Sequence, residues 1–434
     1  MKVVQAYALT NGFPSPIECG NFAPWTKEKG LLNVYPIQRS KLIGFGGSFT
    51  DSSAYNYSLL SDEQKKEVLE ALFGESGLGY NLCRLCIGSS DFAVEEYCYV
   101  EDGDTELASF NIDRDKKYVI PFLKDALAYA KQPIRLFASP WAPPAFMKEN
   151  GTRLQGGKLL VEYYETYAEY IAKFLMAYRA EGVDIWALTP QNEPKAKQTW
   201  ESCFYTPEDE IAFTRVLKGV LSEHGLDVKL IGWDHNKERL FERANQLFSA
   251  EGDLFDGVGF HWYSGAHYNA ISAVKAKYPE KLVLATEFCK TLTAVVDYVS
   301  WRYANEILND LDHGANGICE WNLILDENGG PYHDRVSGCE APVRVDSKTC
   351  TVRRSEIYYD TYMFSHFIRE GAVSLYTSSF DEKIQLTAAQ NPNGELVVIV
   401  FNTGEDCAAR IYIDGEALEV SLTAGGLYTF VIER

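Results

Sequence analysis

The sequence has no long hydrophobic run. Nowhere do about 18 apolar residues follow one another, which is the length that a membrane-spanning helix needs. The start of the chain, Met1–Tyr7, also lacks the apolar stretch of a signal peptide. We therefore expect a soluble, cytoplasmic protein with no stable membrane association.

Positive charge is scarce as well. Lys and Arg number 41 against 61 Asp and Glu, which leaves a formal net charge of -20. This sign repels phosphate backbones and anionic lipid head groups, so we expect no nucleic-acid partner. Hydrophobic residues make up 46% of the chain, which is typical of a globular protein and excludes disorder. No pattern in the sequence indicates an oligomeric state.

Signatures of metal, nucleotide and serine-nucleophile sites are missing. The chain contains no GxSxG, no Walker loop and no second CxxC. The segment Gly44–Phe49 starts like a dinucleotide-binding loop, but its third glycine is absent and no helix follows at once. Cys83 and Cys86 lie three residues apart in an apolar stretch, which puts them on opposite faces of a strand. We expect neither a metal nor a cofactor.

The chain does show a regular alternation of short β-rich stretches and longer amphipathic ones between about residues 42 and 370. Strands that alternate with helices predict an α/β fold, a closed (β/α)8 TIM barrel with functional groups at the C-terminal strand ends. The predicted strands are Leu42–Phe45, Tyr80–Ile87, Ile134–Ser139, Ile185–Pro190, Lys229–Trp233, Val258–His261, Leu282–Thr286 and Gly317–Trp321. Helical segments include Asp62–Phe73, Val161–Glu181, Pro207–His224 and Leu292–Leu311.

After Gly371 the pattern changes to short alternating strands separated by turns such as Asn391–Gly394. This predicts a small attached β-sandwich, and the β-like segments Val3–Ala8 and Leu31–Ile37 would complete its sheets from the other chain end. We expect residues 1–38 to give N-terminal strands to the sandwich, residues 39–370 to form the catalytic barrel, and residues 371–434 to form the C-terminal sandwich.

Two predicted barrel strands end in a carboxylate. Glu193 stands before Pro194, where the backbone is pushed to extended conformations, so the side chain would be aimed; a strand-end glutamate in solvent is the alternative. Glu287 follows an apolar strand, and burial would raise its pKa unless a cation or hydrogen bonds compensate. Arg84, within the second strand, is a candidate cation, unless it forms a structural ion pair at the barrel base.

Tryptophans follow three other strands, at Trp141, Trp262 and Trp321. Indole rings stack on the apolar faces of sugars, and the neighbouring His261 and Tyr263 can donate hydrogen bonds. Each tryptophan alone would indicate packing, whereas three on one barrel face indicate a sugar site. Together with two carboxylates from separate strands, this set of residues is typical of glycoside hydrolysis.

At these clusters the chain resembles glycoside hydrolase family 30, the family of glucosylceramidases, β-1,6-glucanases and related β-glycosidases. The resemblance spans nearly the whole chain and implies a (β/α)8 barrel with a side β-sandwich assembled from both chain ends. The matching segments are Gly44–Asp51, Ser90–Phe92, Ala138–Trp141, Gln191–Pro194, His261–Tyr263, Thr286–Glu287 and Trp321–Leu323 with Gly329–Pro331.

The resemblance implies a retaining double displacement. Glu287 would be the nucleophile and Glu193 the general acid and base, with their carboxyls about 5 to 5.5 Å apart. Asn192 would contact the sugar 2-hydroxyl, while Arg84 and Tyr263 would keep Glu287 ionised. We expect burial and the nearby charge of Glu287 to raise the pKa of Glu193.

The resemblance also implies a substrate-binding set. Asp91, Trp141 and Trp321 would line the subsite for the terminal glycosyl unit, and His261 would support them or be purely structural. We expect a carbohydrate substrate, foremost a β-glucoside or β-1,6-linked glucan. The alternatives are a β-xylosidase or β-fucosidase, or a catalytically silent carbohydrate-binding barrel. The acidic segment Tyr97–Phe110 is expected to be a substrate-selecting loop.

Overall fold

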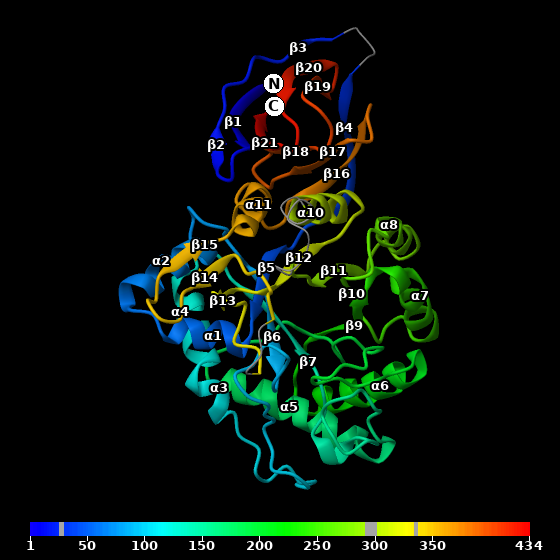
Figure 1. The fold of residues 1–434 in the computed structure, drawn as a ribbon. Coiled ribbons are helices and arrows are strands. Elements are labelled where there is room, and N and C mark those ends of the chain that lie inside the picture. The colour runs from blue at the N-terminus through cyan, green and yellow to red at the C-terminus, as the bar shows by residue number, and fades with distance from the viewer. Residues whose placement is uncertain (26–29, 291–301, 334–336) are drawn as a thin grey trace.

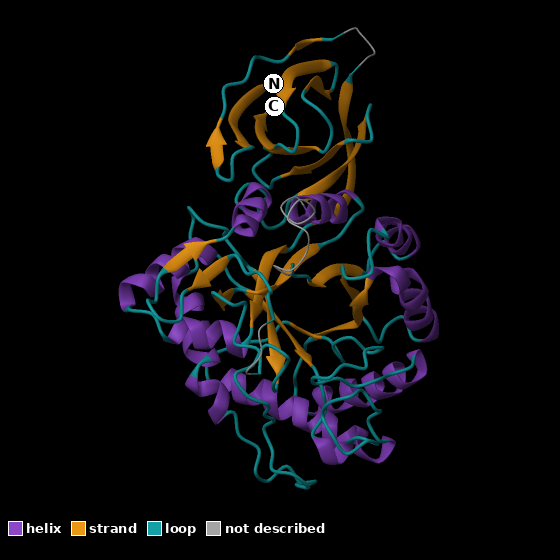
Figure 2. Ribbon diagram, in the orientation of Figure 1, coloured by secondary structure: helices purple, strands orange, loops and turns teal. Residues whose placement is uncertain are grey.

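The computed structural model describes residues 1–25, 30–290, 302–333 and 337–434. Figure 1 shows two parts, a barrel surrounded by helices and a smaller part that holds both chain ends. In Figure 2 the helices gather around the barrel, whereas the smaller part consists of strands and loops. The predicted architecture, a TIM barrel with an attached β-sandwich, is confirmed.

Eight parallel strands close into the barrel in the order β10-β11-β12-β5-β6-β7-β8-β9. They are β5 (Gly44–Phe49), β6 (Leu82–Ile87), β7 (Arg135–Pro140), β8 (Ala187–Leu188), β9 (Lys229–Asn236), β10 (Gly257–His261), β11 (Leu282–Glu287) and β12 (Gly317–Asn322). A three-stranded sheet beside the barrel contains β13 (Ile324–Asp326), β14 (Val343–Val345) and β15 (Val352–Arg354). All eight predicted barrel strands are present, with shifted ends.

The largest shifts affect the first and fourth strands. We expected Leu42–Phe45, but β5 spans Gly44–Phe49, so the glycine-rich segment is the strand itself. A side chain at Gly46 would collide with the main-chain carbonyl of Leu82 on the next strand, which explains why glycine stands there. The fourth strand, β8, is shorter than the predicted Ile185–Pro190.

Helices cover the outside of the barrel (Figure 1). They are α1 (Asp51–Ser58), α2 (Asp62–Phe73), α3 (Asp113–Lys117), α4 (Val119–Tyr129), α5 (Tyr164–Ala180), α6 (Pro207–Glu223), α7 (Leu240–Ala250), α8 (Tyr268–Lys277), α10 (Arg302–Asp312) and α11 (Glu356–Ser365), with short 3-10 turns η1 (Ala145–Met147), η2 (Val161–Tyr163) and η3 (Lys237–Arg239). Of the predicted helix Leu292–Leu311, residues 292–301 lie outside the described residues. No helix in the described ranges is long and apolar enough to cross a membrane.

Strands from both chain ends form one ten-stranded sheet in the order β2-β1-β21-β18-β17-β16-β4-β19-β20-β3. These are β1 (Lys2–Leu9), β2 (Pro14–Pro16), β3 (Ala23–Pro24), β4 (Leu31–Lys41), β16 (Val373–Ser379), β17 (Ile384–Gln390), β18 (Leu396–Asn402), β19 (Cys407–Ile413), β20 (Glu416–Leu422) and β21 (Leu427–Glu433). The first strand, β1, pairs antiparallel with the last, β21, so the two chain ends meet as predicted. The domain limits at residues 38/39 and 370/371 stay predictions.

Helices α10 and α11 lie between the sandwich and the barrel (Figure 1). Asn309 on α10 donates a hydrogen bond to Gln385 on β17 at 2.9 Å. Thr429 on β21 donates to the carbonyl of Met363 on α11 at 2.7 Å. The sandwich therefore contacts the barrel in part through helices α10 and α11.

The barrel interior consists of two layers of different chemistry. A buried apolar cluster, which we call the apolar layer, is formed by Leu82, Phe137, Ala187, Ile231, Leu284 and Cys319. Inward-facing residues recur every second position along a strand, so the next layer begins two residues later. There the polar layer contains Arg84, Ser139, Thr189 and Thr286, all buried. The interior therefore changes from apolar to polar within two residues along each of these strands, towards their C-terminal ends.

Candidate active site

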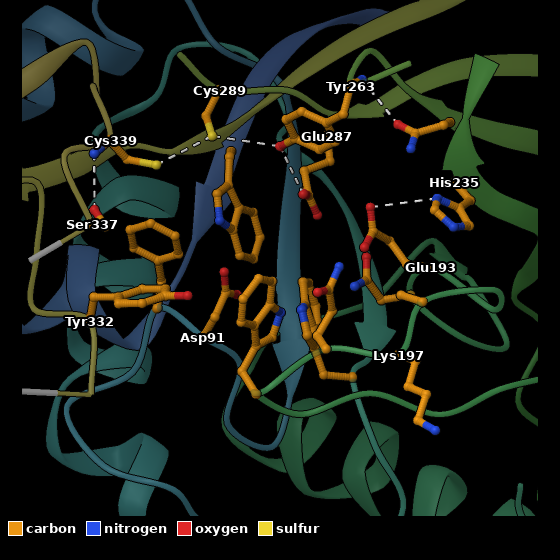
Figure 3. A pocket seen from close by; sticks show the side chains of 18 of the residues that line it. Asp91, Glu193, Lys197, His235, Tyr263, Glu287, Cys289, Tyr332, Ser337 and Cys339 are labelled. Atoms are coloured by element: carbon orange, nitrogen blue, oxygen red, sulfur yellow. Dashed lines mark hydrogen bonds and ion pairs between the residues drawn. The ribbon is translucent and has the colours of Figure 1, made fainter. Parts of the chain in front are cut away.

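A cavity of about 730 Å³ opens above the polar layer, at the C-terminal ends of the barrel strands. Seven of the nine predicted site residues line it, namely Asp91, Trp141, Asn192, Glu193, Tyr263, Glu287 and Trp321. Figure 3 shows the carboxyl groups of Glu193 and Glu287 turned into the same space. The other two predicted residues are fully buried beneath the cavity. Arg84 contacts Glu287, and His261 contacts Glu193. The structure thus brings all nine residues together.

Arg84 is the centre of the polar layer. Its Nη1 donates to Glu287 Oε2 at 2.7 Å, and its Nη2 donates to Asn192 Oδ1 at 2.9 Å and to Asp234 Oδ2 at 2.7 Å. Its guanidinium carbon lies 4.7 Å from the centre of the Trp141 ring. The alternative of an ion pair at the barrel base is therefore wrong, because Arg84 pairs with carboxylates at the C-terminal end of the barrel.

Asp234, which sequence reasoning missed, is a buried carboxylate that binds three residues of the polar layer. It accepts hydrogen bonds from Arg84, from Thr189 at 2.7 Å and from Ser139 at 3.2 Å. Burial alone would raise the pKa of Asp234, but the charge of Arg84 and a hydrogen bond from His261 hold it well below its ordinary value. Its position directly after the predicted apolar strand Lys229–Trp233 was the sequence signal that could have identified it as a site residue.

A bulge in β9 turns Asp234 inward. The register of β9 against β10 shifts at this point, and both Trp233 and Asp234 have positive φ values, of 69° and 47°. A β-bulge inserts an extra residue and redirects side chains. The sequence prediction that the strand ends at Trp233 is therefore wrong, since β9 continues to Asn236 beyond the bulge.

His261 joins the carboxylates to one another. Its Nδ1 lies 3.2 Å from Glu193 Oε1 and its Nε2 lies 3.0 Å from Asp234 Oδ1. Burial would lower the pKa of His261, but the charge of Glu287 and the hydrogen bonds with Asp234 and Glu193 raise it to about 10. We conclude that His261 carries a positive charge at neutral pH.

The contacts of His261 also limit the distance between the two candidate catalytic carboxylates. His261 Nδ1 lies 3.2 Å from Glu193 Oε1 and 3.8 Å from Glu287 Oε1, so these two oxygens cannot be farther apart than about 7 Å. Retaining glycosidases need about 5 to 5.5 Å between carboxyls, and inverting enzymes need about 6.5 to 9.5 Å. The limit on these two oxygens is compatible with the retaining spacing.

The predicted rise in the pKa of Glu193 is wrong for the unliganded protein. Burial would raise this pKa, but the hydrogen bond and charge of His261, together with the charge of His235, bring it below its ordinary value. For Glu287 burial prevails over the charges of His261 and Arg84, so its pKa is raised. Because the two carboxyls interact, their titration belongs to the pair.

The expected extended backbone at Glu193 is wrong as well. Its φ is 47°, in the left-handed region that costs a residue other than glycine about 1 to 3 kcal/mol. The Glu193 amide donates to the carbonyl of Asp234 at 3.0 Å, which ties the two segments together. The strained turn places the carboxylate beside both His261 and His235.

Aromatic rings form the wall of the cavity, but not the three rings that we expected. Trp141 and Trp321 stack with ring centres 5.0 Å apart and an interplanar angle of 20°. Trp262 instead packs against Phe288 in the core and does not line the cavity. Trp200, which had not been singled out, takes its place on the rim.

The acidic segment Tyr97–Phe110 contributes no residue to the lining of this cavity, so the expectation of a substrate-selecting loop is not supported. Tyr97 and Tyr99 donate hydrogen bonds to the buried Asp115 on α3, which hold this segment against the outer helices. Residues of the segment after β8, including Lys195 and Lys197, line the rim instead.

Three side chains in the site have the residue types of metal ligands. The ligand atoms of Glu193, His235 and His261 lie within 4.8 Å of one another. The pKa of His261 is raised to about 10, which favours the protonated imidazole between Glu193 and Asp234. The arrangement is therefore suited to moving protons. The absence of a metal and a cofactor stays a prediction.

Comparisons with known proteins agree with this site. Residues 42–368 match the glycosyl hydrolase family 30 TIM-barrel domain, and residues 371–430 match the glycosyl hydrolase family 30 beta sandwich domain. The lysosomal acid glucosylceramidase of Mus musculus is 31% identical over 402 residues, which cover 87% of this chain and 78% of the relative.

Two solved structures are similar over nearly the whole chain. SrfJ from Salmonella typhimurium has a TM-score of 0.94 and 30% identity, with 99% of each chain covered. The endo-β1,6-glucanase BT3312 has a TM-score of 0.87 and 26% identity, with 100% of each chain covered. Since the family model for the barrel alone matches far more than half of the sequence, the chain belongs to glycosyl hydrolase family 30 and is a hydrolase of glycosidic bonds.

Proposed function

We propose that the protein is a retaining β-glycosidase in which Glu287 is the nucleophile and Glu193 the general acid and base. The observation that carries this proposal is the position of the two carboxylates. Glu287 ends β11 and Glu193 lies in the segment after β8, and both line one cavity and share His261 as a neighbour. Two carboxyl groups at close spacing are the machinery of a double displacement.

In the first step Glu287 attacks the anomeric carbon while Glu193 gives its proton to the leaving oxygen. Arg84 and Tyr263 hold the attacking carboxylate, since Arg84 Nη1 lies 2.7 Å from Oε2 and Tyr263 Oη lies 3.0 Å from Oε1 of Glu287. These two hydrogen bonds, one to each carboxylate oxygen, fix the orientation of the Glu287 side chain in the cavity. They also stabilise its ionised form, against the rise in pKa that burial causes.

In the second step water attacks the glycosyl-enzyme and Glu193 accepts its proton. Glu287 is then an ester without charge, so it no longer opposes the ionisation of Glu193. The neighbouring His261, which lowers the pKa of Glu193, favours this ionised form. The same shift limits the protonated form needed in the first step to low pH, and we therefore expect activity to be greatest below neutral pH.

The substrate that we propose is a β-glucoside or a β-1,6-linked glucan. Similar proteins are named a glucosylceramidase and an endo-β1,6-glucanase, and both names refer to glucosyl substrates. The stacked pair Trp141 and Trp321 offers an apolar wall for the terminal sugar, and Asp91 stands beside it. Asn192 reaches the cavity close to Glu193 and is the candidate contact of the 2-hydroxyl.

The experiment is hydrolysis of aryl β-D-glycosides with gluco, xylo, fuco, galacto and glucurono groups, followed by NMR of the released anomer. We expect turnover of the glucoside, with the β-anomer appearing first, and loss of turnover in Glu287→Gln. Glu238→Gln, which removes an exposed carboxylate outside the cavity, is the matched control. First release of the α-anomer would contradict the double displacement, and full activity of Glu287→Gln would contradict the assigned nucleophile.

A further inference from the structure

Two cysteines face each other on the wall of the cavity. Cys289 lies two residues after Glu287, and Cys339 lies in the segment before β14. Their sulfur atoms are 3.5 Å apart, and both residues are free thiols that line the cavity. Figure 3 shows the two side chains pointing toward one another. An approach this close is what disulfide formation requires.

A short chain of contacts leads from this thiol pair to the proposed nucleophile. Tyr263 Oη lies 3.6 Å from Cys289 Sγ and 3.0 Å from Glu287 Oε1 (Figure 3). A displacement of Cys289 would therefore act on the hydroxyl that holds Glu287.

The two thiols differ in their surroundings. A hydrogen bond from Cys289 and a second contact with Ser337 lower the pKa of Cys339, while the same pairing and burial raise the pKa of Cys289 well above its ordinary value. Arg344, which donates to the Cys339 carbonyl at 2.9 Å, adds positive charge nearby. Thiolates are the nucleophiles of disulfide exchange, so the exchange can start at Cys339, and a start at Cys289, the more exposed of the two residues, gives the same product.

We propose that Cys289 and Cys339 are a redox modification site, at which a small-molecule disulfide forms an intramolecular disulfide bond that reversibly inhibits the enzyme. Neither the family assignment nor the proposed mechanism assigns a role to this pair. The inhibition rests on the proposed function, whereas the chemistry of the two sulfurs does not.

The reaction balances as two exchanges. The Cys339 thiolate attacks one sulfur of the small disulfide, breaks its S–S bond and releases one small thiolate, which takes the proton of Cys289. Cys289, now a thiolate, then attacks Cys339 Sγ and releases the second small thiolate, which takes up the proton that Cys339 gave to the solvent when it ionised. Two electrons and two protons pass from the protein to the oxidant, which leaves as two thiols. A dithiol reductant reduces the Cys289–Cys339 bond by two further exchanges, becomes a disulfide itself and restores both protein thiols.

Inhibition follows from the geometry. The sulfurs must approach by about 1.5 Å to reach a bond length of about 2.05 Å. Cys289 then moves towards Cys339 and away from Tyr263, which also holds Glu287. Misplacement of a reacting group by about 1 Å can cost about 100-fold in rate, so we expect at least about a tenfold loss.

The test uses the full-length protein equilibrated with oxidised glutathione. After alkylation of free thiols and digestion, we expect mass spectrometry to find a Cys289–Cys339 peptide pair lighter by two hydrogens, and to find it gone after dithiothreitol. The oxidised protein should lose at least about tenfold in aryl glycoside turnover and recover on reduction. A single glutathionyl group on Cys339 without the cross-link would overturn the proposal.

Variants separate the two parts of the inference. Each is judged by the ratio of its own oxidised to reduced activity. We expect this ratio to be near one for Cys339→Ser and Cys289→Ser, and to stay low for Cys350→Ser, a thiol outside the cavity. An unchanged low ratio in Cys339→Ser would overturn the inhibition by this pair. If the reduced protein turns over no glycoside, the proposed function fails, while the cross-link still tests the thiol chemistry.

Discussion

The two layers inside the barrel are built from the same strands and are equally buried, yet their chemistry is opposite. Leu82 and Leu284 belong to the apolar layer, whereas Arg84 and Thr286 lie two residues further along the same strands. The apolar layer stabilises the barrel by packing. The polar layer lacks that contribution and contains buried charges, which are tolerated only when they are paired and hydrogen-bonded. The site therefore lies beside the layer whose residues are buried but not hydrophobic.

Of the variants considered, Arg84→Met should have the largest effect, because it removes the central cation of the polar layer. The variant leaves Asp234 and Glu287 buried without their cation, so we expect the free energy of unfolding at neutral pH to fall by about 3 to 5 kcal/mol and turnover to be lost. Without Arg84 the folded-state pKa values of both carboxyls rise above their unfolded values. The destabilisation is then largest at neutral pH and is relieved as the pH falls and protons bind.

Leu82→Ala is the matched control for Arg84→Met, in the apolar layer of the same strand. It should lower the free energy of unfolding by about 2 to 5 kcal/mol, with no dependence on pH, because it leaves a cavity and no charge. Denaturant unfolding at several pH values measures both variants. An equal loss at pH 5 and pH 7 in Arg84→Met would show that the arginine contributes packing alone.

Glu193→Ala tests the carboxylate above the polar layer. General acid catalysis contributes about 100- to 10,000-fold, so kcat/KM on alkyl glycosides should fall by that amount. Aryl glycosides whose leaving group is a good one need no proton, and their first step should be spared. Equal losses on both substrate types would remove the acid role from Glu193.

His261→Gln tests how the polar layer acts on that carboxylate. The positive charge of His261 lowers the pKa of Glu193, so its removal should raise that pKa. Loss of activity on the alkaline side reports loss of the one proton that the Glu193–Glu287 pair must carry on Glu193, and this limb should move to higher pH by about one unit. His224→Gln, at an exposed site on the end of α6, should leave the limb in place. An unmoved limb in His261→Gln would show that its charge does not set the pKa of Glu193.

Much of this organisation could be predicted from the sequence, because it depends on local patterns. Apolar strands at regular intervals predict the barrel, and the charged residues beside them, Glu287 and Arg84, indicate its functional end. The position of Asp234 after an apolar strand was a signal, but the inward direction of its side chain could not be predicted, since it depends on a bulge with two positive φ values. The pKa of Glu193 depends on His261 and His235, which come from other strands.

The tryptophans show the same limit and give the smallest predicted effect. Trp262 directly follows β10 but is buried in the core, whereas Trp200, in the segment between β8 and α6, is partly exposed on the cavity rim. Trp200→Ala should raise KM by about two- to tenfold, which is the loss of one aromatic contact of about 0.5 to 1.5 kcal/mol, at unchanged stability. Trp262→Ala should instead lower the free energy of unfolding by about 3 to 5 kcal/mol. Steady-state kinetics and denaturant unfolding on both variants decide between these assignments, because a stability loss in Trp200→Ala with KM unchanged would make that ring a packing residue.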